Sequence, residues 1–433
     1  MQQTQWYKSR APWFDTPSAF CTRDQLKGKQ ALVVGAGLAG AAVAHRLANL
    51  GLMVKVVDQG ASMAQGASGN LAGALHPLVT ADWNLRSQWY WQGLQATLAY
   101  LEPWLAKDEI KGELNGLLHL AVDEKNFQRM QQALIRVPTI TRFAHWFDVK
   151  QASDKLGGEC PYPGLFFPRA GWFNPPSIVA RCLSHQNIQL ELNQTITGIV
   201  RSDDQAWLVN VQDRAFKADI VVLASGAISS LNDQFDLAIR PVKGQVTQLE
   251  PSYQAWSLGC SVAHQGYSAP ADKGYAVTGA TFEAPDLTPD ASKQADMKNL
   301  AMAQTCLPGW LAPLASQVDM ETSGRVSFRP TTPDHLPIIG ALPDVDWMRV
   351  NYLSQSSSHT PFRFPPQRYN SGLYVSNGHG ARGLMSVFLA ADIIAEQITG
   401  QDVSIDAKLL AACHPARFLI RAWQKTGNGK LIA

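Results

Sequence analysis

A short apolar run at residues 31–34 ends in a cluster of glycines. The run predicts a buried strand, and the small-residue stretch 41–50 predicts a helix that Gly51 ends. A second apolar run over 52–57 predicts another buried strand, which closes on Asp58. Strand, glycine-rich turn, helix, strand and acid in this order indicate a dinucleotide-binding βαβ unit.

The glycine-rich turn has the spacing G-x-G-x-x-G at Gly35, Gly37 and Gly40. The first glycine permits a tight turn, the second lets the backbone approach a pyrophosphate, and the third lets helix and strand pack closely. The helix N-terminus would present free N–H groups and a positive dipole end to that pyrophosphate. Asp58 has the spacing of a carboxylate that binds a free ribose 2′-hydroxyl, which argues against NADP. The expected contacts also include Leu38, Ala39 and Gln59.

Cofactor-like segments recur further along the chain. Small residues at 67–73 follow the second strand, and the apolar run 218–223 predicts a strand that again ends in small residues. A predicted strand over 372–376 leads into a second glycine-rich turn and a helix over 384–398. A nicotinamide enzyme usually uses one contiguous segment, so this recurrence favours a flavin, whose reduced form the late helix dipole would stabilise. The expected contacts are Gly66, Ala67, Ser68, Gly69, Asn70, Ala224, Gly226, Gly378, Gly380, Ala381, Arg382, Gly383 and Leu384.

Composition excludes several classes of protein. With 433 residues, 46% hydrophobic and 17% charged, the chain can bury a large core, which excludes a disordered protein and suggests two or three domains. No stretch approaches the roughly 18 uncharged apolar residues of a membrane span, and the charged first 30 residues contain no secretory signal. The six cysteines form no CxxC pair, so we expect free thiols, no metal site and a cytoplasmic location.

The net charge of +2 says little, but its distribution is uneven. Residues 1–30 and 401–433 each carry five lysines and arginines against two aspartates, so both ends are basic. Basic ends favour a polyanionic partner, and a pair of solvated tails is the alternative explanation. In the last segment Arg417, Arg421 and Lys425 are the candidate contacts, although a basic helix capping the fold would show the same pattern.

The motifs resemble those of the flavoprotein superfamily that includes D-amino-acid, glycine and sarcosine oxidases. Within it, the chain resembles the FAD-dependent oxidoreductase half of the bifunctional tRNA 5-methylaminomethyl-2-thiouridine biosynthesis family. The most particular matches are GASGN at 66–70, GALHPL at 73–78 and RGL at 382–384, and the likeness runs from about residue 35 to 421. A lysine at position 243 replaces the usual arginine. Only about 30 residues precede the first strand, so we expect no methyltransferase domain and an oxidative step performed alone.

The resemblance implies an α/β fold with a Rossmann-like FAD-binding domain and an antiparallel-sheet substrate domain. Because cofactor motifs lie near both ends and in the middle, the FAD-binding domain must be discontinuous. The expected segments are a basic arm at 1–28, the FAD-binding domain at 29–105, 165–240 and 325–400, the substrate domain at 106–164 and 241–324, and a basic tail at 401–433. No cysteine or histidine signature for covalent attachment is present, so non-covalent FAD is expected.

The implied reaction removes the carboxymethyl group oxidatively from 5-carboxymethylaminomethyl-(2-thio)uridine at the tRNA wobble position. Its products are 5-aminomethyl-(2-thio)uridine and glyoxylate. Arg329 is the expected anchor for the substrate carboxylate, because the alternation over 325–330 places it on one strand face with Arg325, the weaker candidate. His379 is expected at the flavin edge, and Trp172 and Tyr275 are either pocket walls or core. No general base is required if the amine arrives neutral.

Three functions stay open at this level. The first is the tRNA-modifying oxidase, with tRNA as substrate and a separate methyltransferase acting afterwards as a candidate partner. The second is a small-molecule amine or amino-acid oxidase of the glycine, sarcosine or D-amino-acid type that does not act on RNA. The third is a flavin-bound RNA-binding protein without turnover, against which Arg329 and the late glycine turn argue.

Overall fold

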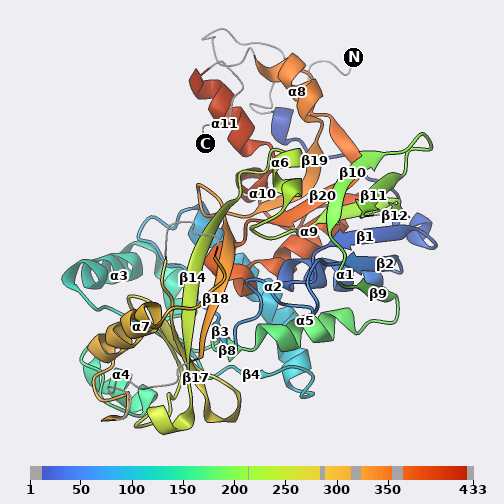
Figure 1. The fold of residues 1–433 in the computed structure, drawn as a ribbon. Helices are drawn as coiled ribbons and strands as arrows, with labels where there is room; N and C mark the ends of the chain where they lie inside the picture. Colours follow the sequence, from blue (N-terminus) through green and yellow to red (C-terminus); the bar gives the residue numbers. More distant parts are fainter. Residues whose placement is uncertain (1–11, 213, 283–287, 314–322, 354–363, 427–433) are drawn as a thin grey trace.

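A computed structural model describes residues 12–212, 214–282, 288–313, 323–353 and 364–426. Residues 1–11 of the expected basic arm and 427–433 of the expected tail lie outside the described part. A six-stranded sheet forms the centre of the fold (Figure 1). Its order is β19 (Ile338–Pro343), β20 (Tyr369–Asn377), β13 (Ile220–Leu223), β1 (Gln30–Val34), β2 (Met53–Val57) and β9 (Ile188–Glu191).

All neighbouring strands of this sheet run parallel except β19, which pairs antiparallel with β20 at one edge. Both faces are buried at the central strands β1 and β13, which explains why these two read as apolar runs. Ala31 and Val33 of β1 face the helical layer, whereas Leu32 and Val34 face a separate cluster on the opposite side. The strands expected from the apolar runs are therefore confirmed.

The helical layer packs around α1 (Leu38–Asn49), which contacts α9 (Val387–Thr399) and α5 (Pro175–Leu183), while α2 (Leu85–Leu105) packs on α9. The opposite face is covered by the antiparallel strands β10 (Ile196–Arg201), β11 (Trp207–Val211) and β12 (Arg214–Ala218). Near the C-terminus lie α6 (Ser230–Gln234), α8 (Val345–Tyr352), α10 (Ala407–Cys413) and α11 (Arg417–Thr426) (Figure 1).

An eight-stranded, mostly antiparallel sheet forms the second part of the fold. Its order is β18 (Ser323–Thr331), β14 (Arg240–Leu249), β17 (Ala276–Gly279), β16 (Tyr267–Pro270), β15 (Ser261–Ala263), β5 (Leu117–Leu120), β7 (Gly164–Phe167) and β6 (His145–Phe147). Three helices contact strands of this sheet, namely α3 (Glu124–Arg136), α4 (Val149–Leu156) and α7 (Lys293–Cys306) (Figure 1). A small sheet of β3 (Gly73–Ala74), β8 (Trp172–Phe173) and β4 (Gly112–Glu113) completes the strands.

This arrangement confirms the expected fold class, a largely parallel sheet with an antiparallel-sheet part beside it. The exact domain boundaries stay a prediction. By sheet membership, β7 and β18 belong to the eight-stranded sheet, although the expected boundaries place most of both strands in the FAD-binding segments. In the part of the chain that the structure describes, no helix has both the length and the apolar character that crossing a membrane requires.

Candidate active site

A cavity of about 1150 Å³ begins at the glycine-rich turn between β1 and α1. Gly35 has a positive φ of 107°, and a Cβ there would lie 2.3 Å from the carbonyl oxygen of Ala224. A Cβ on Gly40 would lie 1.9 Å from the carbonyl oxygen of Gly35. A side chain therefore cannot be accommodated at either position of the turn, as the motif predicts.

Two side chains hold this turn in place and also line the cavity. The carboxylate of Asp58 accepts hydrogen bonds from the backbone N–H groups of Ala36 at 2.6 Å and Gly60 at 2.7 Å. The hydroxyl of Ser68 accepts one from the N–H of Leu38 at 2.9 Å. The first turn of α1 and the segment 66–70 therefore form one wall, with Asp58 at the end of β2.

Arg325 organises this wall from outside the cavity. Its guanidinium donates to the Oδ1 of Asn70 at 2.9 Å and to the carbonyl oxygens of Gln65 and Gly66 at 2.8 and 2.7 Å. Arg325 is absent from the lining, so the prediction that it faces the substrate pocket is wrong. The physical reason is that three oxygens of the 65–70 segment accept hydrogen bonds from its guanidinium and hold it there.

The aromatic residues expected to wall the pocket lie elsewhere. Trp172 is buried in an apolar cluster with Ala72 and Val246, and Tyr275 packs partly buried against the same cluster. Neither lines the cavity, so the core explanation is correct for both. Tyr267 on β16 lines the cavity instead and donates its hydroxyl to the carbonyl of Ala72 at 3.2 Å.

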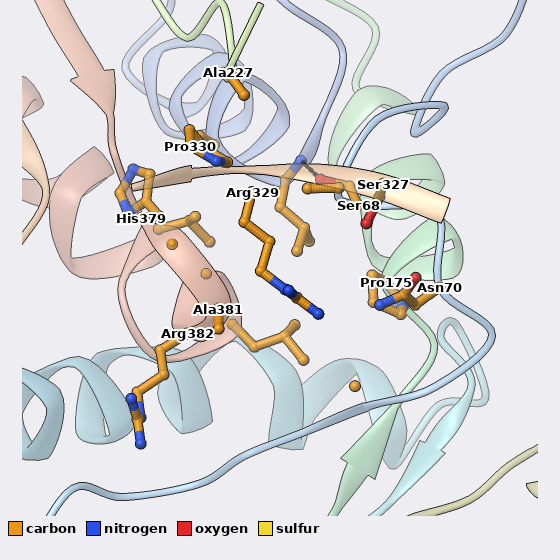
Figure 2. Close-up of a pocket in the computed structure, with 18 of the residues that line it drawn as sticks. Ser68, Asn70, Pro175, Ala227, Ser327, Arg329, Pro330, His379, Ala381 and Arg382 are labelled. Atoms are coloured by element: carbon orange, nitrogen blue, oxygen red, sulfur yellow. Dashed lines mark hydrogen bonds between the residues drawn. The ribbon is translucent and has the colours of Figure 1, made fainter. Parts of the chain in front are cut away.

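Arg329 projects from β18 into the cavity, as Figure 2 shows. Its side chain is buried, donates to the carbonyl of Thr281 at 3.2 Å and stacks 4.6 Å from the ring centre of Phe282. Burial lowers its pKa, and no described carboxylate forms an ion pair with it. Gly244 leaves room for the guanidinium, because a Cβ there would lie 2.2 Å from Nη1. A buried cation without a counterion is suited to bind an anionic ligand.

His379 lies in the late turn at the other side of the cavity (Figure 2). Its Nε2 bonds the Ser376 hydroxyl at 3.1 Å and its Nδ1 bonds the Ser386 hydroxyl at 2.9 Å. Burial lowers its pKa to about 4, so the ring is neutral near pH 7. Both ring nitrogens are occupied by hydroxyl groups, so the prediction of a catalytic histidine is corrected to a structural one, and its place at the flavin edge stays a prediction.

Arg382 in the same turn is better placed to meet a ligand. Burial lowers the pKa of its guanidinium, its Nε is buried without a partner in the described structure, and its Cζ lies 5.5 Å from the ring centre of Tyr90. A buried N–H donor without a partner can bind an anionic or carbonyl-bearing cofactor such as FAD. Of the expected cofactor residues, only Gly40, Gly69 and Gly378 do not line the cavity.

A histidine pair lies in the cavity wall, and of the two only His76 lies near a motif that the sequence marks, without an assigned role. His76 and His119 both line the cavity, with Nε2 of the first 3.4 Å from Nδ1 of the second. Burial, together with the positive charges of Arg382 and Arg129, lowers the pKa of His119 to about 4, and burial lowers the pKa of His76 well below its usual value. Both rings are therefore neutral near pH 7. They come from β5 and from the loop after β3, which meet only in the folded protein.

The basic residues of α11 differ in accessibility. Arg417 is only 1% exposed and donates to both carboxylate oxygens of Asp334, at 2.9 and 3.0 Å. Arg421 contacts the same carboxylate at 2.6 Å, whereas Lys425 is exposed. The prediction of Arg417 as an RNA contact is therefore wrong, because the ion pair buries it. Trp423 is fully buried as well.

Replacing Asp334 with alanine is expected to lower the free energy of unfolding by about 3 kcal/mol, because Arg417 would remain buried without its partner. Burial alone would raise the pKa of Asp334, but the arginines lower it to about 2. The carboxylate thus binds fewer protons when folded. Its stabilisation is present above the unfolded value, near pH 4, and is lost as the pH falls through about 2.

Urea denaturation at neutral and acidic pH measures this effect. Asp346→Ala is the matched control, because that carboxylate is 93% exposed in its pair with Arg349 and should contribute less than about 1 kcal/mol. Equal stability of the two variants would contradict the structural role of Asp334.

Comparisons with known proteins agree with this geometry. The chain is 48% identical over 427 residues to the tRNA 5-methylaminomethyl-2-thiouridine biosynthesis bifunctional protein MnmC of Hydrogenovibrio crunogenus, with 96% of this chain and 62% of the relative covered. The MnmC protein of Pseudomonas fluorescens is 33% identical, with 95% and 61% covered. The chain therefore spans a little over three-fifths of the length of these curated relatives.

Solved structures show the same fold at lower identity. Glycine oxidase from Geobacillus kaustophilus has a TM-score of 0.71 and 22% identity, covering 90% of this chain and 99% of the other. Iminodiacetate oxidase from Chelativorans sp. BNC1 has a TM-score of 0.66 and 21% identity, covering 89% and 98%. A family model described as FAD dependent oxidoreductase matches residues 30–397. The chain belongs to this family of FAD-dependent oxidoreductases and is a homologue of the MnmC proteins.

Proposed function

We propose that this chain oxidatively removes the carboxymethyl group from 5-carboxymethylaminomethyl-(2-thio)uridine at the wobble position of tRNA. The observation that carries the proposal is the buried, unpaired guanidinium of Arg329, which faces the same cavity as the closed glycine turn. The tRNA part is supported by the names of the relatives, which describe the biosynthesis of 5-methylaminomethyl-2-thiouridine in tRNA.

The group to be removed is an N-substituted glycine, so its carboxylate gives the protein a charged handle. Arg329 would bind that carboxylate and thereby fix the adjacent α-carbon in the cavity. When bound, FAD supplies the oxidant that accepts the hydride equivalent from this carbon. The resulting substrate imine adds water and separates into glyoxylate and the aminomethyl uridine.

The protein would hold FAD with elements from both ends of the chain. The glycine-rich turn and Ser68 line one side, and 379–384 of the late turn line the other. With the amine neutral, the α-carbon can lose a hydride without a protein base, and the buried histidines of the cavity wall are themselves neutral at pH 7. Arg329 and Arg382 are then the cations that remain in the buried part of the site.

Nucleoside analysis of treated tRNA tests the proposal. We expect 5-carboxymethylaminomethyl-2-thiouridine to disappear from the digest by mass spectrometry, while 5-aminomethyl-2-thiouridine and an equal amount of glyoxylate appear. The second candidate function is oxidation of a free amino acid, since Arg329 could anchor any α-amino carboxylate. Turnover of glycine, sarcosine or D-amino acids without any change in the tRNA would support that candidate instead.

The proposed product also bears on partners and location. An aminomethyl uridine lacks the methyl group named in the relatives' pathway, so a methyl transfer must follow, by a separate methyltransferase if this chain carries none. A tRNA substrate is consistent with action in the cytoplasm.

Non-covalent FAD binding gives a direct prediction. No cysteine among the described residues lines the cavity, and both ring nitrogens of His379 are occupied by hydroxyl groups. Acid or heat denaturation followed by filtration should therefore release all of the yellow cofactor into the filtrate. Colour that stays with the precipitated chain would contradict this prediction.

A further inference from the structure

One end of the cavity has a rim of arginines. Arg86 lies in the first turn of α2, and Arg129 and Arg136 lie seven residues apart on α3, so that they share one face of that helix. All three line the cavity, and those on α3 are exposed. Their charge reaches inward, because Arg129 helps to lower the pKa of the buried His119, after burial and Arg382.

These arginines have no ion-pair partner among the described residues. Several arginines elsewhere in the fold do have carboxylate partners, such as Arg46 with Asp392 and Arg181 with Glu109. The carboxylate among the nearby lining residues is Asp82, which accepts a hydrogen bond from Asn84 at 3.1 Å. Gathering unpaired like charges at a cavity mouth favours an anionic ligand with several charges.

An aromatic side chain stands beside the arginines. Trp83 lies between two lining residues and has a φ of 45°, a conformation that bulky residues rarely adopt. Its ring is partly exposed and packs 5.9 Å from that of Phe143, on which Trp91 stacks at 3.9 Å. The backbone of Trp83 is thus held in an unfavourable φ region, with the indole near the rim. Such strained residues are often found at functional sites.

We propose that this rim, Arg86, Arg129 and Arg136 with Trp83, is the RNA-binding surface of the enzyme. The arginines would bind the phosphates on either side of the modified nucleotide, and Trp83 would stack on a neighbouring base. The inference rests on the proposed function and adds to it the place where the RNA docks. A wobble base must leave its single-stranded loop to reach a buried site, which leaves flanking phosphates at the cavity mouth.

The rim fits RNA better than α11 does. On α11, Asp334 holds Arg417 and Arg421 in ion pairs, and Trp423 is buried. A free amino acid bound at Arg329 would fit inside the cavity and would have no use for cations at its mouth. A partly exposed aromatic side chain beside arginines without ion-pair partners is a combination by which proteins hold unstacked nucleotides.

The test compares the double variant Arg129→Ala/Arg136→Ala with the control Arg214→Ala. Arg214 is exposed on β12, in the three-stranded sheet that Figure 1 shows on the other side of the molecule from α3. For the double variant, the Kd for tRNA should rise about tenfold or more, since two charged contacts are lost. The slope of log affinity against log salt should become shallower by about 1.4, and Arg214→Ala should change neither.

Turnover separates failure of this inference from failure of the proposed function. The ratio of kcat/KM for tRNA to that for the free modified nucleoside should fall about tenfold in the double variant. If the wild-type enzyme oxidises tRNA and the double variant matches it in Kd and in this ratio, the inference is wrong and the proposed function stands. If the wild-type enzyme releases no glyoxylate from modified tRNA, the proposed function itself is wrong.

Discussion

Replacing Arg329 with glutamine is expected to lower kcat/KM about 30-fold or more while FAD stays bound. The guanidinium is buried, faces the cavity and has no described carboxylate partner, so the substrate would supply its counterion. Loss of one partner from a buried charge pair costs about 2–5 kcal/mol, which corresponds to at least a 30-fold effect. Glutamine keeps a hydrogen-bond donor but removes the charge and the planar fork.

Arg325→Gln is the matched comparison, because both arginines lie on β18. Arg325 bonds Asn70 and the carbonyls of Gln65 and Gly66, so its loss should weaken FAD retention. Steady-state kinetics and flavin content measured on both variants separate these roles. An Arg329→Gln enzyme within about threefold of wild-type kcat/KM would show that the carboxylate is bound elsewhere.

Replacing Gly40 with alanine is expected to abolish FAD binding. The added Cβ would lie 1.9 Å from the carbonyl oxygen of Gly35, and this neighbour is backbone that cannot rotate away. Helix α1 would have to move away from β1, which separates the helix N-terminus from the turn that receives the pyrophosphate. The purified variant should be colourless, with flavin content measured by absorbance and folding by circular dichroism.

Gly198→Ala is the control for a general effect of glycine replacement. Gly198 lies on β10, and the nearest atom to its Cβ would be the Oε1 of Gln234 at 4.0 Å. This variant should keep its cofactor. A Gly40→Ala protein that retains full flavin content would contradict the assignment of the turn as the FAD site.

The parts of the site that the sequence predicted are those that depend on local structure. The glycine turn, the strands beside it and Asp58 follow from a single βαβ segment, so spacing alone places them together. Arg329 followed from strand alternation and from the family resemblance. The same alternation misplaced Arg325, because strand periodicity gives a face and cannot show that the oxygens of 65–70 lie beside that guanidinium.

The remaining parts depend on contacts between distant segments. Asp334 pairs with Arg417, which lies 83 residues later in the sequence. Helix α11, which the sequence suggests is a basic tail, is therefore held to the body of the protein by a buried ion pair. His119 and the arginines of α3 reach the site through the eight-stranded sheet and its helices. Neither composition nor a short motif marks these residues, since each is ordinary in its own segment.

The central claim is that the bound flavin oxidises a glycine-like group carried on tRNA. The most direct test is anaerobic reduction of the holoenzyme, followed by the visible absorbance of its flavin. We expect tRNA bearing 5-carboxymethylaminomethyl-2-thiouridine to bleach the flavin and release stoichiometric glyoxylate, with free glycine, sarcosine and D-amino acids leaving it oxidised. Bleaching by the free amino acids and none by the modified tRNA would contradict the claim and identify a small-molecule oxidase.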